Sequence, residues 1–232
     1  LVYQKAAFNT PVWMNLGVPN REPQCWACLI IGVDDDMESI QDGWRVESET
    51  FRGGSGSGVN VSRIRAAGEP LSDGNGVGSG PISLWMRPTD SIAGVVRSGG
   101  RTRRAAKMVV MDVDHPEIEE FVETKVKAEN IARLLQSNGY DISMQGEDSA
   151  NIPFQNANNS VRVDDEFMET LDSPQKVDYL LKGRVSSDFD RVIDPHKLWN
   201  RIVTAAWECG DPGIQFKDTI NKMNPVPYDG EI

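Results

Sequence analysis

The sequence has no apolar run of the ~18–20 residues that a membrane-spanning helix needs, and no charged-then-apolar signal segment opens it. Only three cysteines are present, an odd and sparse set that does not suit the disulfide framework of a secreted protein. Because the chain has 232 residues, it buries enough surface to fold without a metal or a disulfide. We therefore expect a cytoplasmic protein with no membrane partner.

An excess of positive charge is also missing. The formal net charge is −11, whereas nucleic-acid binding needs a basic face, so we expect no nucleic-acid partner. The exception is the acid-free stretch "RSGGRTRRAAK" at 97–107. Such a cationic loop predicts a site for a small anion such as phosphate, and Gly99 and Gly100 would let the backbone approach that ligand. A solvated loop is the alternative.

Apolar runs alternate with amphipathic segments along the chain. Residues 25–33 and 107–115 have the length and composition of strands buried on both faces. Helices are predicted after them, over 34–52 with an aspartate cap and over 116–139 with Gly139 as the stop, and a further amphipathic helix should end at Gly210. The order strand-then-helix recurs, which predicts an α/β fold with crossover connections.

Two prolines suggest local breaks in this pattern. Pro11 should push Thr10 into extended backbone, with the threonine hydroxyl exposed, after a short helix end near the start of the chain. Pro88 should interrupt a helix over 82–96 soon after it begins.

A glycine-rich segment, "GGSGSGVN" at 53–60, has neither of the common nucleotide-binding patterns. It lacks the Gly-Lys-Ser/Thr ending of a Walker loop, and the order of strand and helix around it is the reverse of a Rossmann fingerprint. Its four glycines would allow backbone N–H groups to approach a sugar or a phosphate closely. A plain flexible loop remains the alternative.

The pair Cys25-x-x-Cys28 has three possible interpretations. A structural zinc site needs four ligands, and only Cys209, His115 and His196 could complete it, without the paired spacing such sites have. A thioredoxin-like pair lies at a helix N-terminus, whereas Cys28 begins an apolar strand. Two half-buried structural thiols are the third interpretation.

Seven segments decide between these interpretations: "FNTPVWMN", "ACLI", "DDDMESI", "GSGSGVNVSRIR", "RSGGRTRRAAKMVVMDVDHPEIEEFVETK", "NANNSVRVDDEFM" and "AAWECGDPGIQFKDTIN". In order and spacing they resemble adenosylcobalamin-dependent (class II) ribonucleotide reductases over nearly the whole chain. The resemblance implies a ten-stranded α/β barrel made of two parallel five-stranded halves. We expect 1–232 to be one partial catalytic barrel domain, the first half-barrel, incomplete at its C-terminal end.

The resemblance also implies a chemistry. In that family, adenosylcobalamin generates a thiyl radical that abstracts the 3′ hydrogen of a ribonucleotide, the 2′ hydroxyl leaves as water, and a cysteine pair supplies the electrons. Cys28 matches the first cysteine of that pair, while Cys25 and Cys209 match nothing in the motifs. The radical cysteine and the second reducing cysteine would follow Ile232, and the resemblance implies no metal ligand in this stretch.

Further site residues are implied in the same way. The substrate-binding positions are Thr10, Ala27, Cys28 and Gly56. A deoxynucleoside triphosphate effector would lie near Asp35, Asp36, Met37 and Arg65, although the aspartate at 36 departs from the small polar residue usual there. The loop that links the effector to substrate choice would comprise Ser98, Gly99, Gly100, Arg101, Arg103 and Arg104. The family also implies a thioredoxin-like reductant and a homodimer.

Two alternatives remain. The class I large subunit shares the barrel and the cysteines but takes its radical from a metal-containing partner, and "FNTPVW" and "DVDHPEIEEF" favour the cobalamin group instead. The other alternative is a non-catalytic, nucleotide-binding half-barrel that needs a complementing chain. A finger-loop motif after Ile232 would distinguish them.

Overall fold

The computed structural model describes residues 2–20, 24–96, 105–143, 146, 148, 152–175 and 177–232. Its centre is a five-stranded sheet in the order β1-β2-β3-β4-β7, in which every neighbouring pair is parallel. The strands are β1 (Cys28–Ile31), β2 (Gly56–Asn60), β3 (Lys107–Asp112), β4 (Ala157–Val163) and β7 (Gly213–Phe216). The predicted α/β class is confirmed, and one parallel five-stranded sheet is consistent with half of the expected barrel.

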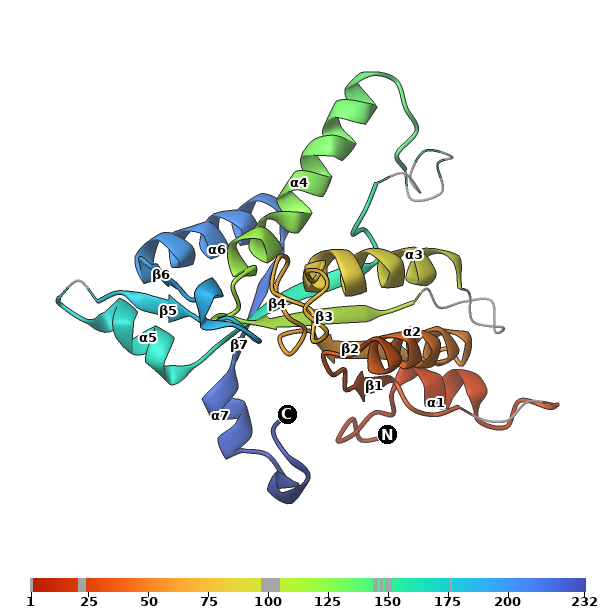
Figure 1. The fold of residues 1–232 in the computed structure, drawn as a ribbon. Helices are drawn as coiled ribbons and strands as arrows, with labels where there is room; N and C mark the ends of the chain where they lie inside the picture. The colour runs from red at the N-terminus through yellow and green to blue at the C-terminus, as the bar shows by residue number, and fades with distance from the viewer. Residues whose placement is uncertain are drawn as a thin grey trace.

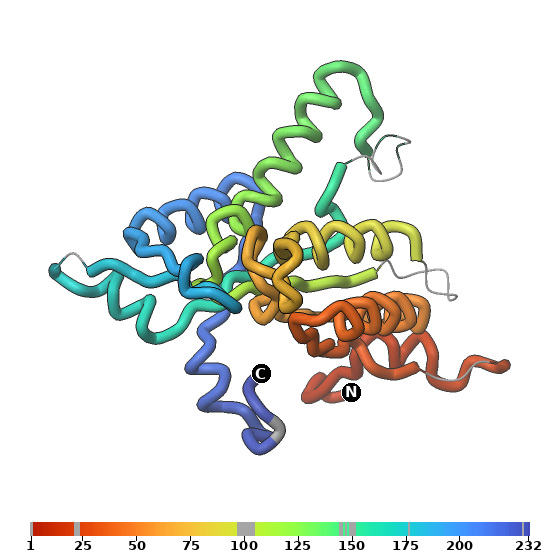
Figure 2. Tube along the Cα trace, viewed as in Figure 1, coloured from red at the N-terminus to blue at the C-terminus, as the bar shows by residue number. Residues whose placement is uncertain are grey.

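Helices connect the strands as crossovers. They are α2 (Met37–Arg52), α3 (Arg87–Val95), α4 (Ile118–Ser137), α5 (Asp165–Asp172) and α6 (Pro195–Cys209). Two further helices lie outside the crossovers: α1 (Thr10–Asn15) precedes β1, and α7 (Lys217–Lys222) follows β7. Shorter elements are the π-helix Ile82–Met86, the 3-10 helices Ser187–Phe189 and Pro227–Asp229, and an antiparallel hairpin of β5 (Tyr179–Leu181) and β6 (Arg191–Ile193). Figure 1 shows α3, α4 and α6 on one side of the sheet, with α7 and both chain ends on the other. In Figure 2 the β5–β6 hairpin and α1 lie at opposite edges of the molecule.

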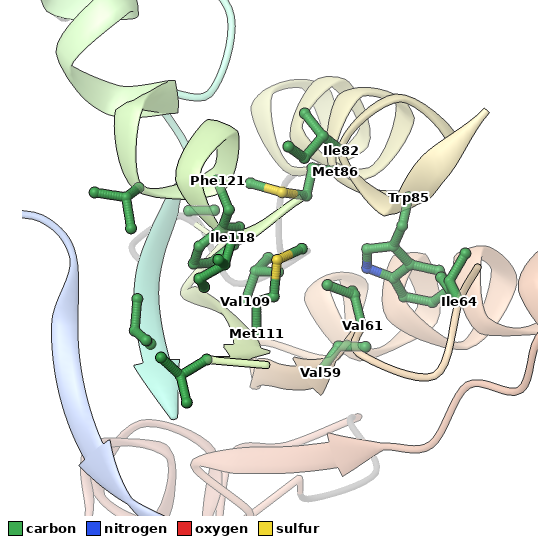
Figure 3. Close-up of a cluster of buried hydrophobic side chains, with 14 of the residues drawn as sticks. Val59, Val61, Ile64, Ile82, Trp85, Met86, Val109, Met111, Ile118 and Phe121 are labelled. Carbon is green, nitrogen blue, oxygen red and sulfur yellow. The ribbon is translucent and has the colours of Figure 1, made fainter. Parts of the chain in front are cut away.

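The two faces of the sheet differ because successive side chains of a strand alternate in direction. One face carries Val59, Val109, Met111 and Val161, each at most 1% exposed, and packs against the helices. Figure 3 shows this core, where Trp85 and Phe121 meet the strand side chains. The alternate positions form what we call the inner face. By register these are Cys28, Ile30, Gly56, Gly58, Asn60, Met108, Val110, Asp112, Asn158, Ser160, Arg162, Gly213 and Gln215.

The first strand differs from its prediction. We expected the run at 25–33 to be buried on both faces, but Cys28, Leu29 and Ile30 are exposed, and Ile31 and Val33 are the buried residues of the run. Ile30 is 81% exposed. The reason is topological, because β1 is an edge strand that pairs with β2 alone. The run at 107–115 is largely buried, since β3 lies at the centre of the sheet, but burial on both faces is incomplete because Met108 is exposed.

Both proline predictions were wrong in detail. Thr10 is the first residue of α1 and Asn9 is the extended residue, whose side chain accepts from Val12 N at 3.1 Å. Pro11 fits the first helical turn because its missing N–H is not needed there. Thr10 is exposed, as predicted. Pro88 does not interrupt its helix, since the preceding π-helix runs directly into α3. Pro88 lies in the first turn of α3, where a proline is tolerated.

The local signals at other helix ends were confirmed. Asp36 caps α2 by accepting from Ser39 N at 2.8 Å. Gly139, at φ +88°, follows α4, and Gly210, at φ +80°, ends α6, both in the left-handed region that glycine tolerates. In the described part of the chain, no helix combines the length and the apolar character that crossing a membrane requires.

Candidate active site

Cys28 and Gly56 lie side by side at the amino ends of β1 and β2. They are register partners, and the thiol of Cys28 is exposed. A Cβ atom added to Gly56 would lie 3.2 Å from Cys28 Sγ, 2.8 Å from Ala106 O and 3.1 Å from Ala106 Cβ. The missing side chain of Gly56 therefore leaves the space that the thiol and the neighbouring chain occupy.

Backbone hydrogen bonds hold three chain segments together at this point. Gly56 N donates to Ala27 O at 2.8 Å, and Ser57 N donates to Ala106 O at 2.9 Å. Of the four positions expected to bind substrate, the structure thus brings together Ala27, Cys28 and Gly56. Thr10 stands at the start of α1 and, within the described residues, makes no hydrogen bond to any of them.

A polar cluster that the sequence did not indicate ties α1 to these strand ends. Asn15 Nδ2, in α1, donates to Gln24 O at 2.6 Å. The Gln24 side chain accepts from Trp26 N at 2.7 Å and donates to Ser55 Oγ, which in turn donates to Trp26 O. The helix that carries Thr10 is therefore fixed beside Cys28. These contacts span up to 31 positions, so no local pattern reveals them.

The other cysteines take no part in this contact. Cys25 is half-buried, and neither Cys25 nor Cys28 forms a disulfide. Cys209 is also half-buried, and its thiol donates to Ala205 O at 3.3 Å, within its own helix. Among the described residues, no group of three or more His, Cys, Asp and Glu side chains could hold a metal ion.

The residues expected to bind an effector lie at the opposite, carboxyl ends of β1 and β2. Asp35 Oδ2 is 2.7 Å from Arg65 Nε, and Asp35 Oδ1 accepts from Arg65 N at 3.0 Å. Arg65 also donates to Pro70 O at 2.6 Å and to Ser72 Oγ at 3.3 Å, so Ser72 joins this cluster without having been predicted. Cys28 is the first of the four residues of β1, so three steps of about 3.3 Å place the carboxyl end of the strand about 10 Å from Cys28, and the effector residues follow that end.

The remaining effector positions flank this pair. Asp36 is the N-cap of α2, so its carboxylate already accepts a backbone N–H. Met37 begins the helix and is 51% exposed. Together with the Asp35–Arg65 pair they surround the amino end of α2, whose dipole favours an anion.

Two titratable groups fix the loop that carries Arg65. His115 Nε2 lies 3.0 Å from Ile64 O, and His115 Nδ1 accepts from Glu117 N at 3.0 Å. Burial lowers the pKa of His115 to about 4, so the ring is neutral. Glu117 Oε1 accepts from Ala67 N at 2.6 Å, and burial raises the pKa of the Glu117 carboxyl to about 7.

The predicted basic loop gives a mixed result. Ser98, Gly99, Gly100, Arg101, Arg103 and Arg104 lie outside the described residues. Lys107, counted with this cationic stretch, does not face an anion site. It is buried and paired with Glu47, because it enters β3 on the face that packs against helices.

The described residues do not fit the cobalt of adenosylcobalamin. Both ring nitrogens of His115 are occupied, and His196 is exposed in the first turn of α6. A groove of about 510 Å³ lies between α4 and α6, lined among others by Glu123, Lys127 and Arg201. Figure 1 places α4 and α6 away from β1, so this groove is not part of the Cys28 site.

Comparison with known proteins identifies the family. Residues 26–232 match the family model described as ribonucleotide reductase, barrel domain. The vitamin B12-dependent ribonucleotide reductase of Streptomyces clavuligerus is 49% identical over 232 residues, which are 100% of this chain and 24% of that protein. The protein of the same name from Rhodopirellula baltica is 40% identical, covering 100% of this chain and 25% of that protein. The vitamin B12-dependent ribonucleoside-diphosphate reductase of Thermoplasma acidophilum is 33% identical, covering 97% and 26%.

The chain thus spans about a quarter of the length of these relatives. The family match itself covers the sheet, helices α2 to α7 and the Cys28–Gly56 contact. The resemblance predicted from the sequence is confirmed: the chain belongs to the ribonucleotide reductase family and is part of its barrel domain.

Proposed function

We propose that this chain contributes one reducing thiol, Cys28, to a vitamin B12-dependent ribonucleotide reductase. The observation that carries the proposal is the exposed thiol of Cys28 beside the side-chain-free Gly56, at the amino ends of two parallel strands. The absence of a side chain at position 56 would let a sugar come close to the backbone there. Residues 1–232 would form one incomplete barrel domain that other parts of the protein complete.

The reaction is balanced by two thiols. The C2′–O bond of the ribonucleotide breaks, a C2′–H bond forms and the oxygen leaves as water. Two cysteine thiols lose two electrons and two protons and become a disulfide. Cys28 is one of them, the second thiol and the radical thiol belong to the protein beyond Ile232, and a thioredoxin-like dithiol then reduces the disulfide.

Adenosylcobalamin, when bound, would supply the radical that starts the reaction, and the names of the relatives support this choice of cofactor. Since the described residues do not fit the cobalt, we assign its site to the rest of the protein. The role of this chain is to place a thiol and to bind nucleotide.

The substrate residues have separate roles in this proposal. The Thr10 hydroxyl would donate to the nucleotide, since the side chain is exposed on a helix that the Gln24 cluster holds beside the strand ends. Ala27 supplies backbone next to the ribose. Gly56 leaves room for it, because even one added carbon would contact Cys28 Sγ.

The second cluster would bind a deoxynucleoside triphosphate that regulates substrate choice. Asp35, Asp36, Met37 and Arg65 lie at the amino end of α2, past the carboxyl end of β1, which is about 10 Å from Cys28 by strand length. That separation supports two sites over one. The loop from Ser98 to Arg104 would connect them.

The test is Cys28→Ser in the full-length enzyme. Multiple-turnover formation of deoxynucleotide should be lost, because a hydroxyl cannot form the disulfide, while effector binding should remain. Cys25→Ser is the matched control, and we expect nearly wild-type activity from it. Equal deoxynucleotide formation by Cys28→Ser and wild type would refute the assignment.

A further inference from the structure

Glu47 and Lys107 form an ion pair that is closed off from water. Lys107 Nζ lies 2.6 Å from Glu47 Oε2, and both side chains are 0% exposed. Ser57 Oγ donates to the other carboxylate oxygen, Glu47 Oε1, at 2.7 Å. The pair therefore joins α2, β2 and β3 through side chains alone.

A contribution to stability does not by itself explain why two charged residues are buried here. Removing two charges from water is costly, and apolar side chains of similar volume often stabilise a core as well or better. Burial also lowers the pKa of the Lys107 ammonium, which shows that the surroundings disfavour its charge. Such a pair does supply a fixed geometry, since each buried charge must remain beside its partner.

The pair lies directly behind the proposed substrate site. Lys107 follows Ala106, whose carbonyl accepts from Ser57 N at 2.9 Å, and Ser57 follows Gly56. Any displacement of the Glu47 carboxylate would act on both strands next to Cys28. The Cβ of Ala106 is one of the atoms that a side chain at position 56 would meet.

The chain on each side of residues 97–104 is held by a buried charged residue. Lys107 holds it on the C-terminal side. On the N-terminal side is α3, where Asp90 is 5% exposed and accepts from Asn156 N at 2.8 Å. Asn156 Nδ2 also donates to Asp90 O at 3.1 Å. The charge of Asp90 favours the charged form of Lys107, so the two anchors interact.

Helix α2 connects this anchor with the proposed effector site. Its first residue, Met37, follows Asp36, and Glu47 lies ten positions further along the same helix. At about 1.5 Å per residue, the distance along the axis is about 15 Å. A shift of the amino end of α2 would therefore move the Glu47 carboxylate as well.

We propose that Glu47 and Lys107 are positioning residues that connect the effector site to substrate choice. The inference rests on the proposed function. The pair transmits the position of α2 to the strand ends beside Cys28 and to the C-terminal anchor of residues 97–104. It touches neither the substrate nor the effector.

The test uses the full-length enzyme with the double replacement Glu47→Gln and Lys107→Met. This variant removes both charges together, so no unpaired charge is buried, and the amide that replaces the Glu47 carboxylate keeps an oxygen to accept from Ser57 Oγ. The matched control is Glu49→Gln, on the same helix, whose partner Arg45 lies 3.0 Å away in an ion pair that is 58–59% exposed. Reduction of all four ribonucleotides is measured with each deoxynucleoside triphosphate, together with the melting temperature.

We expect the double variant to melt close to wild type and to reduce at least one substrate, but to lose its effector-dependent preference about fivefold or more. Glu49→Gln should keep the preference of the wild type. If the pair has a purely structural role, a double variant that is as stable as the wild type should also keep the wild-type preference. An unchanged preference, or a double variant that cannot fold, would therefore overturn the inference.

The wild type separates this inference from the proposed function. A wild-type enzyme that forms deoxynucleotides without any effector-dependent preference contradicts the inference and leaves the proposed function intact. A wild-type enzyme that forms none contradicts the proposed function, and the inference that rests on it is then rejected too.

Discussion

Replacing Gly56 by alanine should disturb both the stability of the sheet and the reactivity of Cys28. The new Cβ would lie 2.8 Å from Ala106 O and 3.2 Å from Cys28 Sγ. Carbon contacts are most favourable at about 3.5–4.0 Å, so the backbone at Ala106 must shift by several tenths of an ångström. That carbonyl accepts from Ser57 N at 2.9 Å, and the shift weakens this hydrogen bond.

The magnitude follows from these contacts. Overpacking of this kind typically costs about 1–3 kcal/mol, and a weakened backbone hydrogen bond costs up to about 1 kcal/mol. We therefore expect Gly56→Ala to lower the free energy of unfolding by about 1–4 kcal/mol. The matched control is Gly58→Ala, two positions along the same strand, where an added Cβ meets nothing within 4 Å. It should be neutral, or stabilising by up to about 1 kcal/mol, because alanine restricts the unfolded chain.

Two measurements on the full-length protein check this prediction. Urea unfolding gives the free energy, and alkylation of Cys28 by iodoacetamide reports on access to its thiol. Gly56→Ala should slow alkylation, because the new methyl group lies against the sulfur, whereas Gly58→Ala should not. If both variants unfold and react alike, the close contact between Gly56 and Cys28 does not exist and the proposed site is wrong.

Three other predictions concern the polar groups and the extent of the chain. Because the pKa of Glu117 is raised to about 7, the folded state binds the proton more tightly than the unfolded chain, and the free energy of unfolding of the wild type should fall as the pH rises from 4.5 to about 7. Glu117→Gln should remove this fall, which urea unfolding across the pH range measures. Parallel curves for the variant and the wild type would contradict the prediction. Asp35→Asn should lower the unfolding free energy by about 1–3 kcal/mol, because Arg65 loses its ionic partner in a largely buried site. Its control, Asp34→Asn, breaks an exposed pair with Arg63 and should cost less than about 1 kcal/mol, so equal losses would argue against the buried cluster. The isolated 232-residue chain should form no deoxynucleotide with adenosylcobalamin, nucleotide and reductant; product formation by the purified chain would show that it is catalytically sufficient.

The sequence alone predicted the features that depend on neighbouring residues. An aspartate cap, which the structure assigns to Asp36, and the glycine stops at Gly139 and Gly210 were correct, because each is formed within one helical turn. The alternation of strands and helices was correct because buried strands and amphipathic helices differ in their hydrophobic period. The strand β7 and the β5–β6 hairpin were not predicted, since their short runs of three or four residues have no clear period.

Motif resemblance predicted which residues belong to the site, but not how they lie. The family was confirmed by comparison, whereas the roles assigned to Thr10, Cys28 and the effector residues remain predictions. The exposure of β1 could not be foreseen, because an apolar run looks the same at the edge and at the centre of a sheet.

Only the tertiary structure decided which residues contact one another at and around the proposed site. Cys28 meets Gly56 across 28 positions, Gln24 meets Ser55 across 31, and Lys107 meets Glu47 across 60. None of these pairs has a local signature, because parallel strands are joined by long crossovers and their register is set by packing of the whole sheet. The sequence determined the elements and the chemistry available, and the order of strands in the sheet determined which of those groups meet.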